Sequence, residues 1–190
     1  MLRYAKLVIG VLFGVFIFAL LDYALPSKKT VRISDTYNRL TTVTTSNAMF
    51  WASTGGGTAQ TPAGQRDVFF IDTVRPNGRV FVYRNEDTGW VWPPYFKYNS
   101  SNLHAEATTL KSTPSEPIWV SVTAYGWRMP WLSTYPNAVS ISVVSGPDDR
   151  PTNWGALIVC GVMLMLLALI WRMWAQFRER AAVRLNRWRS

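Results

Sequence analysis

Few side chains in this sequence have the types and spacing needed for acid–base, nucleophilic or metal chemistry. The chain of 190 residues has one histidine, His104, and one cysteine, Cys160. One thiol forms no disulfide within the chain, and one histidine with one cysteine makes no cluster of metal ligands. Asn85, Glu86 and Asp87 carry oxygen atoms that suit a hard cation such as Ca²⁺. Polar residues directly after a strand usually form a turn, so we predict no metal site.

Motifs for nucleotide binding and acyl transfer are also missing. The run Gly55-Gly56-Gly57 lacks the Lys-Ser or Lys-Thr pair that a phosphate-binding loop needs, and no G-x-S-x-G sequence occurs. His104 is expected on a helix, where a solvated position is the simpler interpretation. Because no base or orienting partner can be named for any serine or threonine, we predict no enzyme, no catalytic residue and no cofactor.

Aromatic residues dominate the surroundings of Pro93 and Pro94. Most of these rings are expected to fill the core of a small domain or to rest at a membrane interface. The alternative is a preformed surface that contacts a partner protein or a ligand. Arg84 and Arg128 could stack on the rings as cation–π partners or pair with Glu86 and Asp87. The predicted contact residues are Trp90, Trp92, Tyr95, Phe96, Tyr125, Trp127 and Arg128.

An apolar segment at the N-terminus is the first of two elements that must position these residues. Between Tyr4 and Leu25 only Lys6 and Asp22 are charged. A helix of this length extends roughly 33 Å, enough to span a hydrocarbon layer of ~30 Å. A cleaved signal peptide is the competing interpretation, but no A-x-A site follows. We therefore predict an uncleaved transmembrane helix at residues 1–26, with a G-x-x-x-G face for helix packing at Gly10 and Gly14.

A second apolar segment lies near the C-terminus. Trp154–Trp171 contains no charged residue and has a tryptophan at each end. Six arginines and one acidic residue follow, so the positive-inside rule places this end in the cytoplasm. We predict a second transmembrane helix at residues 153–172 and a basic amphipathic tail at 173–190 that lies on anionic lipid. The predicted membrane-surface residues are Arg178, Arg180, Arg184 and Arg187.

The net charge of +9 is unevenly distributed. Two thirds of the excess lies outside residues 27–152, mostly in the C-terminal tail. A protein that binds nucleic acid concentrates basic residues on a folded face, so we predict no nucleic-acid partner.

The segment between the two helices, residues 27–152, contains the pattern of a β-hairpin. Asp67–Val74 and Arg79–Arg84 are rich in β-branched and aromatic residues, and Arg75–Gly78 joins them as a turn. Pro76 presets the first corner of that turn. Gly78 can adopt the positive φ that a type I turn followed by a bulge requires.

Four more short strands are expected at 31–36, 40–45, 118–125 and 138–144, from alternating or Thr/Val-rich patterns. One helix is expected near Asn102–Lys111, where apolar residues recur at helical spacing ahead of a proline. Six strands and one helix predict a membrane-anchored α+β fold. Its two transmembrane helices would flank a small, mostly antiparallel barrel or sandwich with one short helix.

The same segment contains several distinctive motifs, namely Asp67-Val-Phe-Phe-Ile71, Thr73-Val-Arg-Pro-Asn-Gly78, Tyr83-Arg-Asn-Glu-Asp-Thr-Gly89, Trp92-Pro-Pro-Tyr-Phe-Lys97, Tyr125-Gly-Trp-Arg128 and Pro136-Asn-Ala-Val139. With these motifs the chain resembles a proteobacterial inner-membrane family known only as a domain of unknown function. The resemblance runs from the first apolar segment into the second. It implies a bacterial inner-membrane protein with a periplasmic domain, and it implies no activity.

We therefore expect a protein of the bacterial inner membrane with both termini cytoplasmic and the central domain periplasmic. The predicted function is a non-enzymatic accessory or scaffold subunit of a larger inner-membrane assembly, docking through its two helices and its β-domain. The alternative is a membrane-tethered periplasmic binding module that recognises an envelope ligand or partner protein through the aromatic surface. The expected partners are membrane lipids and a membrane protein.

Overall fold

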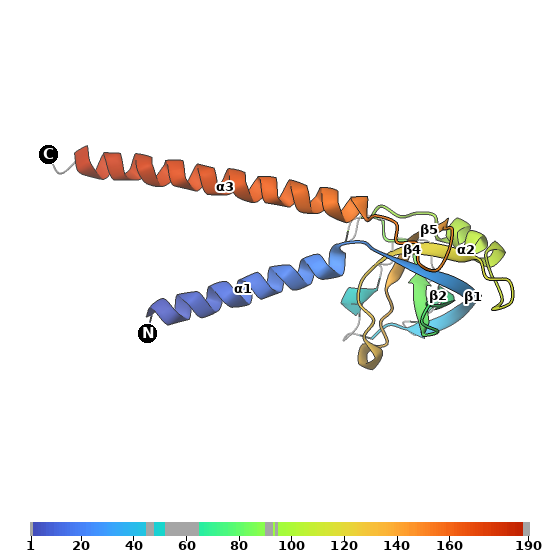
Figure 1. The fold of residues 1–190 in the computed structure, drawn as a ribbon. Coiled ribbons are helices and arrows are strands. Elements are labelled where there is room, and N and C mark those ends of the chain that lie inside the picture. The colour runs from blue at the N-terminus through green and yellow to red at the C-terminus, as the bar shows by residue number, and fades with distance from the viewer. Residues whose placement is uncertain (1, 45–47, 52–64, 90–92, 94, 188–190) are drawn as a thin grey trace. The chain divides into compact units, whose positions relative to one another are not determined.

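The computed structural model describes residues 2–44, 48–51, 65–89, 93 and 95–187. The chain divides into two units, Met1–Thr152 and Asn153–Ser190. The first unit holds helix α1 (Leu2–Ala24) and the β-domain, and the second holds helix α3 (Trp154–Arg187). Figure 1 shows α1 leading directly into the first strand of the β-domain.

The β-domain is a closed five-stranded barrel. Its strands follow one another around the barrel in the order β1, β2, β3, β5, β4. All neighbours are antiparallel except β3 and β5, which are joined in parallel at Arg84 and Asn137. The strands are β1 (Ser27–Thr42), β2 (Gln65–Val74), β3 (Val80–Asn85), β4 (Trp119–Tyr125) and β5 (Asn137–Val143). A barrel has no open edge along which another strand could add.

The predicted hairpin of β2 and β3 is confirmed, together with its turn. Gly78 N–H donates to Arg75 O at 2.9 Å, and Arg75 N–H donates to Arg79 O at 2.9 Å. Gly78 has φ +78°, in the left-handed region that the bulge after a type I turn needs. Six residue pairs from Phe69–Asn85 to Val74–Val80 then follow in register.

The expectation of six strands was wrong by one. The strands predicted at 31–36 and 40–45 belong to a single strand, β1, of 16 residues. Its first part pairs with β4 from Ser27 to Arg32, and its second part pairs with β2 from Arg32 to Thr42. The β1–β2 pairing has an irregularity in its register between Ile33 and Asp35, just after the residue that both pairings share. Such a bulge bends a strand. One long bent strand therefore takes the place of two short ones and closes the barrel.

Apolar side chains of the strands meet inside the barrel. Ile33, Ile71, Val120 and Val122 are completely buried, each with 0% of its surface exposed. Helix α2 (Ser100–Thr109) adds Leu103 and Ala107 to the same core, so the helix predicted near 102–111 is confirmed with its start two residues earlier. A second cluster consists of Trp51, Val68 and Phe70, with Tyr37, Val43, Val82 and Tyr135 packed against it.

Two helices are long and apolar enough to cross a membrane, at Leu7–Ala24 and Trp154–Arg180. Their apolar side chains are exposed along most of both segments. Helix α3 continues without a break to Arg187, so the predicted tail begins inside the same helix as the apolar segment. With 34 residues, α3 extends about 51 Å, well beyond a hydrocarbon layer of ~30 Å.

Candidate functional site

A cluster of charged side chains is buried in the β-domain where β3 ends and β5 begins. Its members are Arg66, Arg84, Glu86 and Lys97, and we call them the buried charge cluster. Their exposed fractions are 6%, 2%, 3% and 4%. Charged side chains are seldom this buried unless other groups compensate them, because removal from water costs several kcal/mol per ion. We therefore take this cluster as the candidate functional site.

Glu86 is the centre of the cluster. One carboxylate oxygen lies 3.4 Å from Arg66 Nη1, and the other lies 3.4 Å from Arg84 Nη1. Asn137 fixes the backbone of Glu86, since it accepts the Glu86 N–H at 2.9 Å and donates to Glu86 O at 3.0 Å. The same amide of Asn137 donates to the Tyr125 hydroxyl at 3.1 Å. The parallel contact between β3 and β5 therefore places the carboxylate between two guanidinium groups.

Lys97 brings a third cation to the same region. Its ammonium group donates to Ala138 O at 2.7 Å and to the side-chain oxygen of Asn85. Asn85 in turn donates to Ser100 O at 2.8 Å, at the start of α2. Burial lowers the pKa of Lys97 to about 7, although the carboxylates of Asp87 and Glu86 act in the opposite direction. The ammonium group of Lys97 can therefore gain or lose its proton near neutral pH.

The side chains of the acidic turn after β3 are bonded to other residues of the β-domain. Glu86 faces two arginines, and Asp87 accepts the Ser100 N–H at 2.8 Å at the first residue of α2. Asn85 is bonded to Lys97 and Ser100. Each of these three side chains, considered above as oxygen ligands, thus has a partner within the protein. Among the described residues, no group of three His, Cys, Asp or Glu side chains could hold a metal ion.

Aromatic rings lie against Arg84 and beside Asn137. The Arg84 guanidinium lies 4.9 Å from the centre of the Trp51 ring. Arg84 also pairs with Glu86, which is one of the two acidic residues predicted as its partners. Tyr95 stacks on Tyr125 with ring centres 4.5 Å apart. Burial raises the pKa of Tyr125, so this hydroxyl stays protonated beside Asn137. The Trp51 ring thus helps to bury the Arg84 guanidinium.

The last turn of α1 is bonded directly to the barrel, and we call this the α1–barrel junction. Gly126 N–H donates to Tyr23 O at 3.0 Å, and Trp127 Nε1 donates to Asp22 Oδ2 at 2.8 Å. The Tyr95 hydroxyl donates to Ala24 O at 2.5 Å.

Ring contacts strengthen the same junction. Tyr23 has edge-on contacts with Tyr125 and Trp127, with ring centres 6.2 and 5.4 Å apart. The backbone at Gly126 has φ +95°, a conformation that favours glycine.

Three of the predicted contact residues lie at the α1–barrel junction, namely Tyr95, Tyr125 and Trp127. Tyr95 and Tyr125 form a stack at the junction, and Tyr125 is only 3% exposed, so its ring belongs to the interior. Trp127 is bonded to α1. Phe96 alone of the aromatic members described is largely exposed, at 49%. Arg128 lies over the Tyr135 ring at 4.1 Å and donates to Thr134 O, whereas Trp90 and Trp92 lie outside the described residues.

The helix residues singled out in the sequence lie on exposed faces. A side chain added at Gly10 or Gly14 would meet nothing within 4 Å in this chain. Arg178 is exposed and lies 5.3 Å from the Trp174 ring, and Arg180 is exposed as well. Arg184 and Arg187 belong to α3, but their side chains are outside the described part. Their roles in helix packing and at a membrane surface stay predictions.

His104 and Cys160 occupy positions of different kinds. The His104 ring stacks on Phe69, with ring centres 4.4 Å apart, so it is a packed residue of α2 rather than a fully solvated one. Burial lowers the pKa of His104 below its ordinary value of 6.5, which keeps the ring neutral at physiological pH. Cys160 is an exposed free cysteine within α3.

Sequence reasoning did not find Arg66, Lys97 and Asn137, and it considered Glu86 as a turn residue, a possible cation ligand and a possible partner of Arg84. A usable signal was present in the motifs around Arg84 and Lys97, where charged and amide residues directly adjoin a strand. The predicted contact residues in those motifs are mainly the aromatic ones. Only the pairing of β3 with β5 shows that the polar residues meet inside the barrel.

Comparison with known proteins places the chain in a family. The model of a family described as "Protein of unknown function (DUF1523)" matches residues 2–178. An uncharacterised protein of Haemophilus influenzae is 35% identical over 153 residues, which cover 80% of each chain. No solved structure matches the chain. The resemblance noted in the motifs is confirmed, and this chain belongs to the DUF1523 family.

Proposed function

We propose that this protein is a non-enzymatic accessory or scaffold subunit of a larger bacterial inner-membrane assembly. It docks through its two apolar helices and holds the barrel at a fixed place beside its partner. Both termini are cytoplasmic and the barrel is periplasmic, as the arginines after the second apolar segment favour. The α1–barrel junction is the observation that carries this proposal.

The junction supports a scaffold because it removes the flexible linker that usually separates an anchor from its domain. Only Leu25 and Pro26 lie between α1 and β1, and three hydrogen bonds tie the last turn of α1 to Tyr95, Gly126 and Trp127. Any displacement of α1 is therefore transmitted to the barrel. A partner that binds α1 in the membrane thereby also sets the position of the barrel.

The junction also favours a permanent anchor over a cleaved signal peptide. Cleavage after α1 would leave the Gly126 N–H, the Trp127 indole and the Tyr95 hydroxyl without their partners. With different tags at its two ends, the protein should appear in bacteria as a single species that carries both. In spheroplasts both tags should resist external protease while the barrel region is cut. Loss of the N-terminal tag would contradict the anchor, and digestion of either tag would contradict the topology.

A second prediction concerns the packing face of α1. Gly10→Ile with Gly14→Ile should sharply reduce recovery of the complex after detergent extraction, because the bulkier side chains keep a partner helix away. The isolated chain should be unaffected, since nothing lies within 4 Å of either added side chain. Val8→Ile with Leu12→Ile changes another exposed part of the helix and serves as the matched control. Size analysis and mass spectrometry of the extracted species provide the measurement.

The same extraction separates the proposal from its alternative. A stoichiometric partner that is lost only in the glycine variant supports the subunit. A lone protein whose melting temperature rises with an envelope ligand would instead support a binding module. The feature that favours the module is the pair of exposed rings of Phe96 and Tyr98, at 49% and 60%, on the segment next to Lys97. Phe96 also has φ +49°, a backbone conformation that costs free energy for a non-glycine residue.

A further inference from the structure

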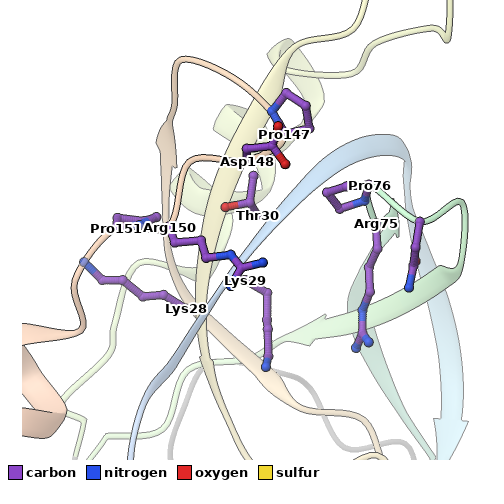
Figure 2. A pocket seen from close by; sticks show the side chains of 10 residues that line it. Lys28, Lys29, Thr30, Arg75, Pro76, Pro147, Asp148, Arg150 and Pro151 are labelled. Carbon is purple, nitrogen blue, oxygen red and sulfur yellow. The ribbon is translucent and has the colours of Figure 1, made fainter.

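A pocket with a cavity volume of about 450 Å³ lies between three segments of the first unit. The start of β1 contributes Lys28 and Lys29, and the β2–β3 turn contributes Arg75 and Asn77. The segment after β5 contributes Asp148 and Arg150. Figure 2 shows the Arg150 side chain extending toward Lys29, with Lys28 extending to the other side and Arg75 extending from the neighbouring hairpin. The pocket thus gathers cations from three separate parts of the chain.

The pocket has a strong excess of positive charge. Four cationic side chains line it, and Asp148 is the one acidic side chain among its lining residues. In the described part of the chain, none of the four cations has a carboxylate within 4.0 Å. The neighbouring Asp149 directs its carboxylate to the backbone of its own loop, accepting the Ser145 N–H at 3.3 Å. The Asp149 carboxylate is therefore bonded within its loop, and within the part of the chain that the structure describes it forms no ion pair with the four cations of the pocket.

Contacts in the surrounding structure hold the walls in place. Thr30 donates to Asp149 O, which fixes the loop after β5 against β1. Lys28 Nζ donates to Thr152 O at 3.2 Å. The Arg75 guanidinium lies 4.4 Å from the centre of the Phe81 ring, and its buried Nε has no hydrogen-bond partner among the described residues. Arg75 is thus a positioned cation with unused donor capacity.

The chemistry that fits is a phosphate group. A guanidinium binds phosphate oxygens in a bidentate manner, and lysine ammonium groups add point charges. Four cations around one concave site raise the local positive potential, which attracts an anion. A neutral ligand would gain little from this positive potential. The phosphate of an ester would interact favourably with it, and an apolar remainder of the ester could lie outside the pocket.

The position of the pocket in the chain points to a lipid as the source of that phosphate. Lys28 follows the end of α1 by four residues, and Arg150 precedes the start of α3 by four. Four residues of extended chain span at most ~14 Å, so both walls stay close to the ends of apolar helices. We infer that this pocket binds the phosphate of an anionic phospholipid headgroup on the side of the membrane where the barrel emerges. The inference rests on the membrane anchoring in the proposed function.

The test uses the full chain purified in a neutral detergent, with phosphatidylglycerol added as the probe. Lipid should raise the melting temperature of the unchanged protein. Lys29→Gln with Arg150→Gln should weaken binding by about thirtyfold, since each cation near a lipid surface contributes ~1 kcal/mol. Arg39→Gln with Lys111→Gln removes the same charge from exposed positions outside the pocket and should leave binding unchanged. Both variants should melt like the unchanged protein when no lipid is added.

Two further probes identify the source of the phosphate. Phosphatidylcholine, which is zwitterionic, should produce a much smaller shift than phosphatidylglycerol. Inorganic phosphate that binds as tightly as phosphatidylglycerol, with the same loss in the pocket variant, would overturn the lipid assignment in favour of a soluble anion. Equal binding by the pocket and control variants would overturn the site itself. Failure of the scaffold proposal would appear separately, as the absence of a partner in the extraction experiment.

Discussion

Replacing Glu86 with glutamine is expected to lower the free energy of unfolding by about 3 to 5 kcal/mol, the largest effect of any single substitution proposed for this chain. The carboxylate lies 3.4 Å from both Arg66 and Arg84, and all three side chains are at most 7% exposed. Glutamine keeps the shape but removes the charge that compensates two buried guanidinium groups. Urea unfolding of the purified full chain, followed by tryptophan fluorescence, measures the change.

Two further variants separate charge from shape. Asp35→Asn removes an acid from the exposed pair with Lys111 at 2.7 Å and should change the free energy of unfolding far less, because water already screens that pair. Arg66→Met combined with Glu86→Gln should recover part of the lost stability, since one uncompensated cation is then removed. If Glu86→Gln and Asp35→Asn behave alike, Glu86 does not compensate the two arginines.

The fold could be predicted from the sequence where local patterns decide it. The β2–β3 hairpin has its turn residues and its alternation in one continuous stretch, and α2 has helical spacing. The sequence pattern divides strand β1 in two, because Tyr37–Arg39 interrupts the alternation between the two predicted strands. These three residues stay in the strand because each of them pairs with β2. Backbone hydrogen bonds to a distant strand leave no trace in local hydrophobicity.

The candidate site was beyond sequence reasoning for a related reason. Charged residues are normally expected at the surface. The sequence therefore indicated Arg84 as a partner for aromatic rings or acidic residues, and it indicated Lys97 only as part of a motif. They are buried together because the barrel closes by joining the end of β3 to the start of β5, at Arg84 and Asn137. That parallel contact joins residues 53 positions apart. No periodicity within either strand could predict it.

The second large effect is a pH dependence of stability that arises from Lys97. Burial lowers its pKa to about 7 from the ordinary value of 10.5. Between these two values the unfolded chain binds one more proton than the native protein, so the free energy of unfolding rises with pH. The slope is at most ~1.4 kcal/mol per pH unit. Below about pH 7 both states carry the proton, and Lys97 then contributes no slope.

Other titrating groups limit the usable window to about pH 7 to 9. Burial raises the pKa of Tyr83 to about 12 and also raises that of Tyr95. The unfolded chain loses these tyrosine protons first, so above about pH 10 the tyrosines lower stability as pH rises, opposite to Lys97. The pKa of His104 is lowered from 6.5, which confines its titration to pH values below the window.

Lys97→Met should therefore remove the rise in the free energy of unfolding between pH 7 and 9. Lys111→Met is the matched control, because it deletes an ammonium group that is exposed and should leave the rise in place. Urea unfolding at several pH values measures both variants and the unchanged chain. The absolute stability of Lys97→Met is a separate quantity, since methionine leaves Asn85 Oδ1 and Ala138 O without their donor. A rise that persists in Lys97→Met, or a flat profile in the unchanged chain, would show that Lys97 keeps its proton throughout this range and that the surrounding carboxylates outweigh its burial.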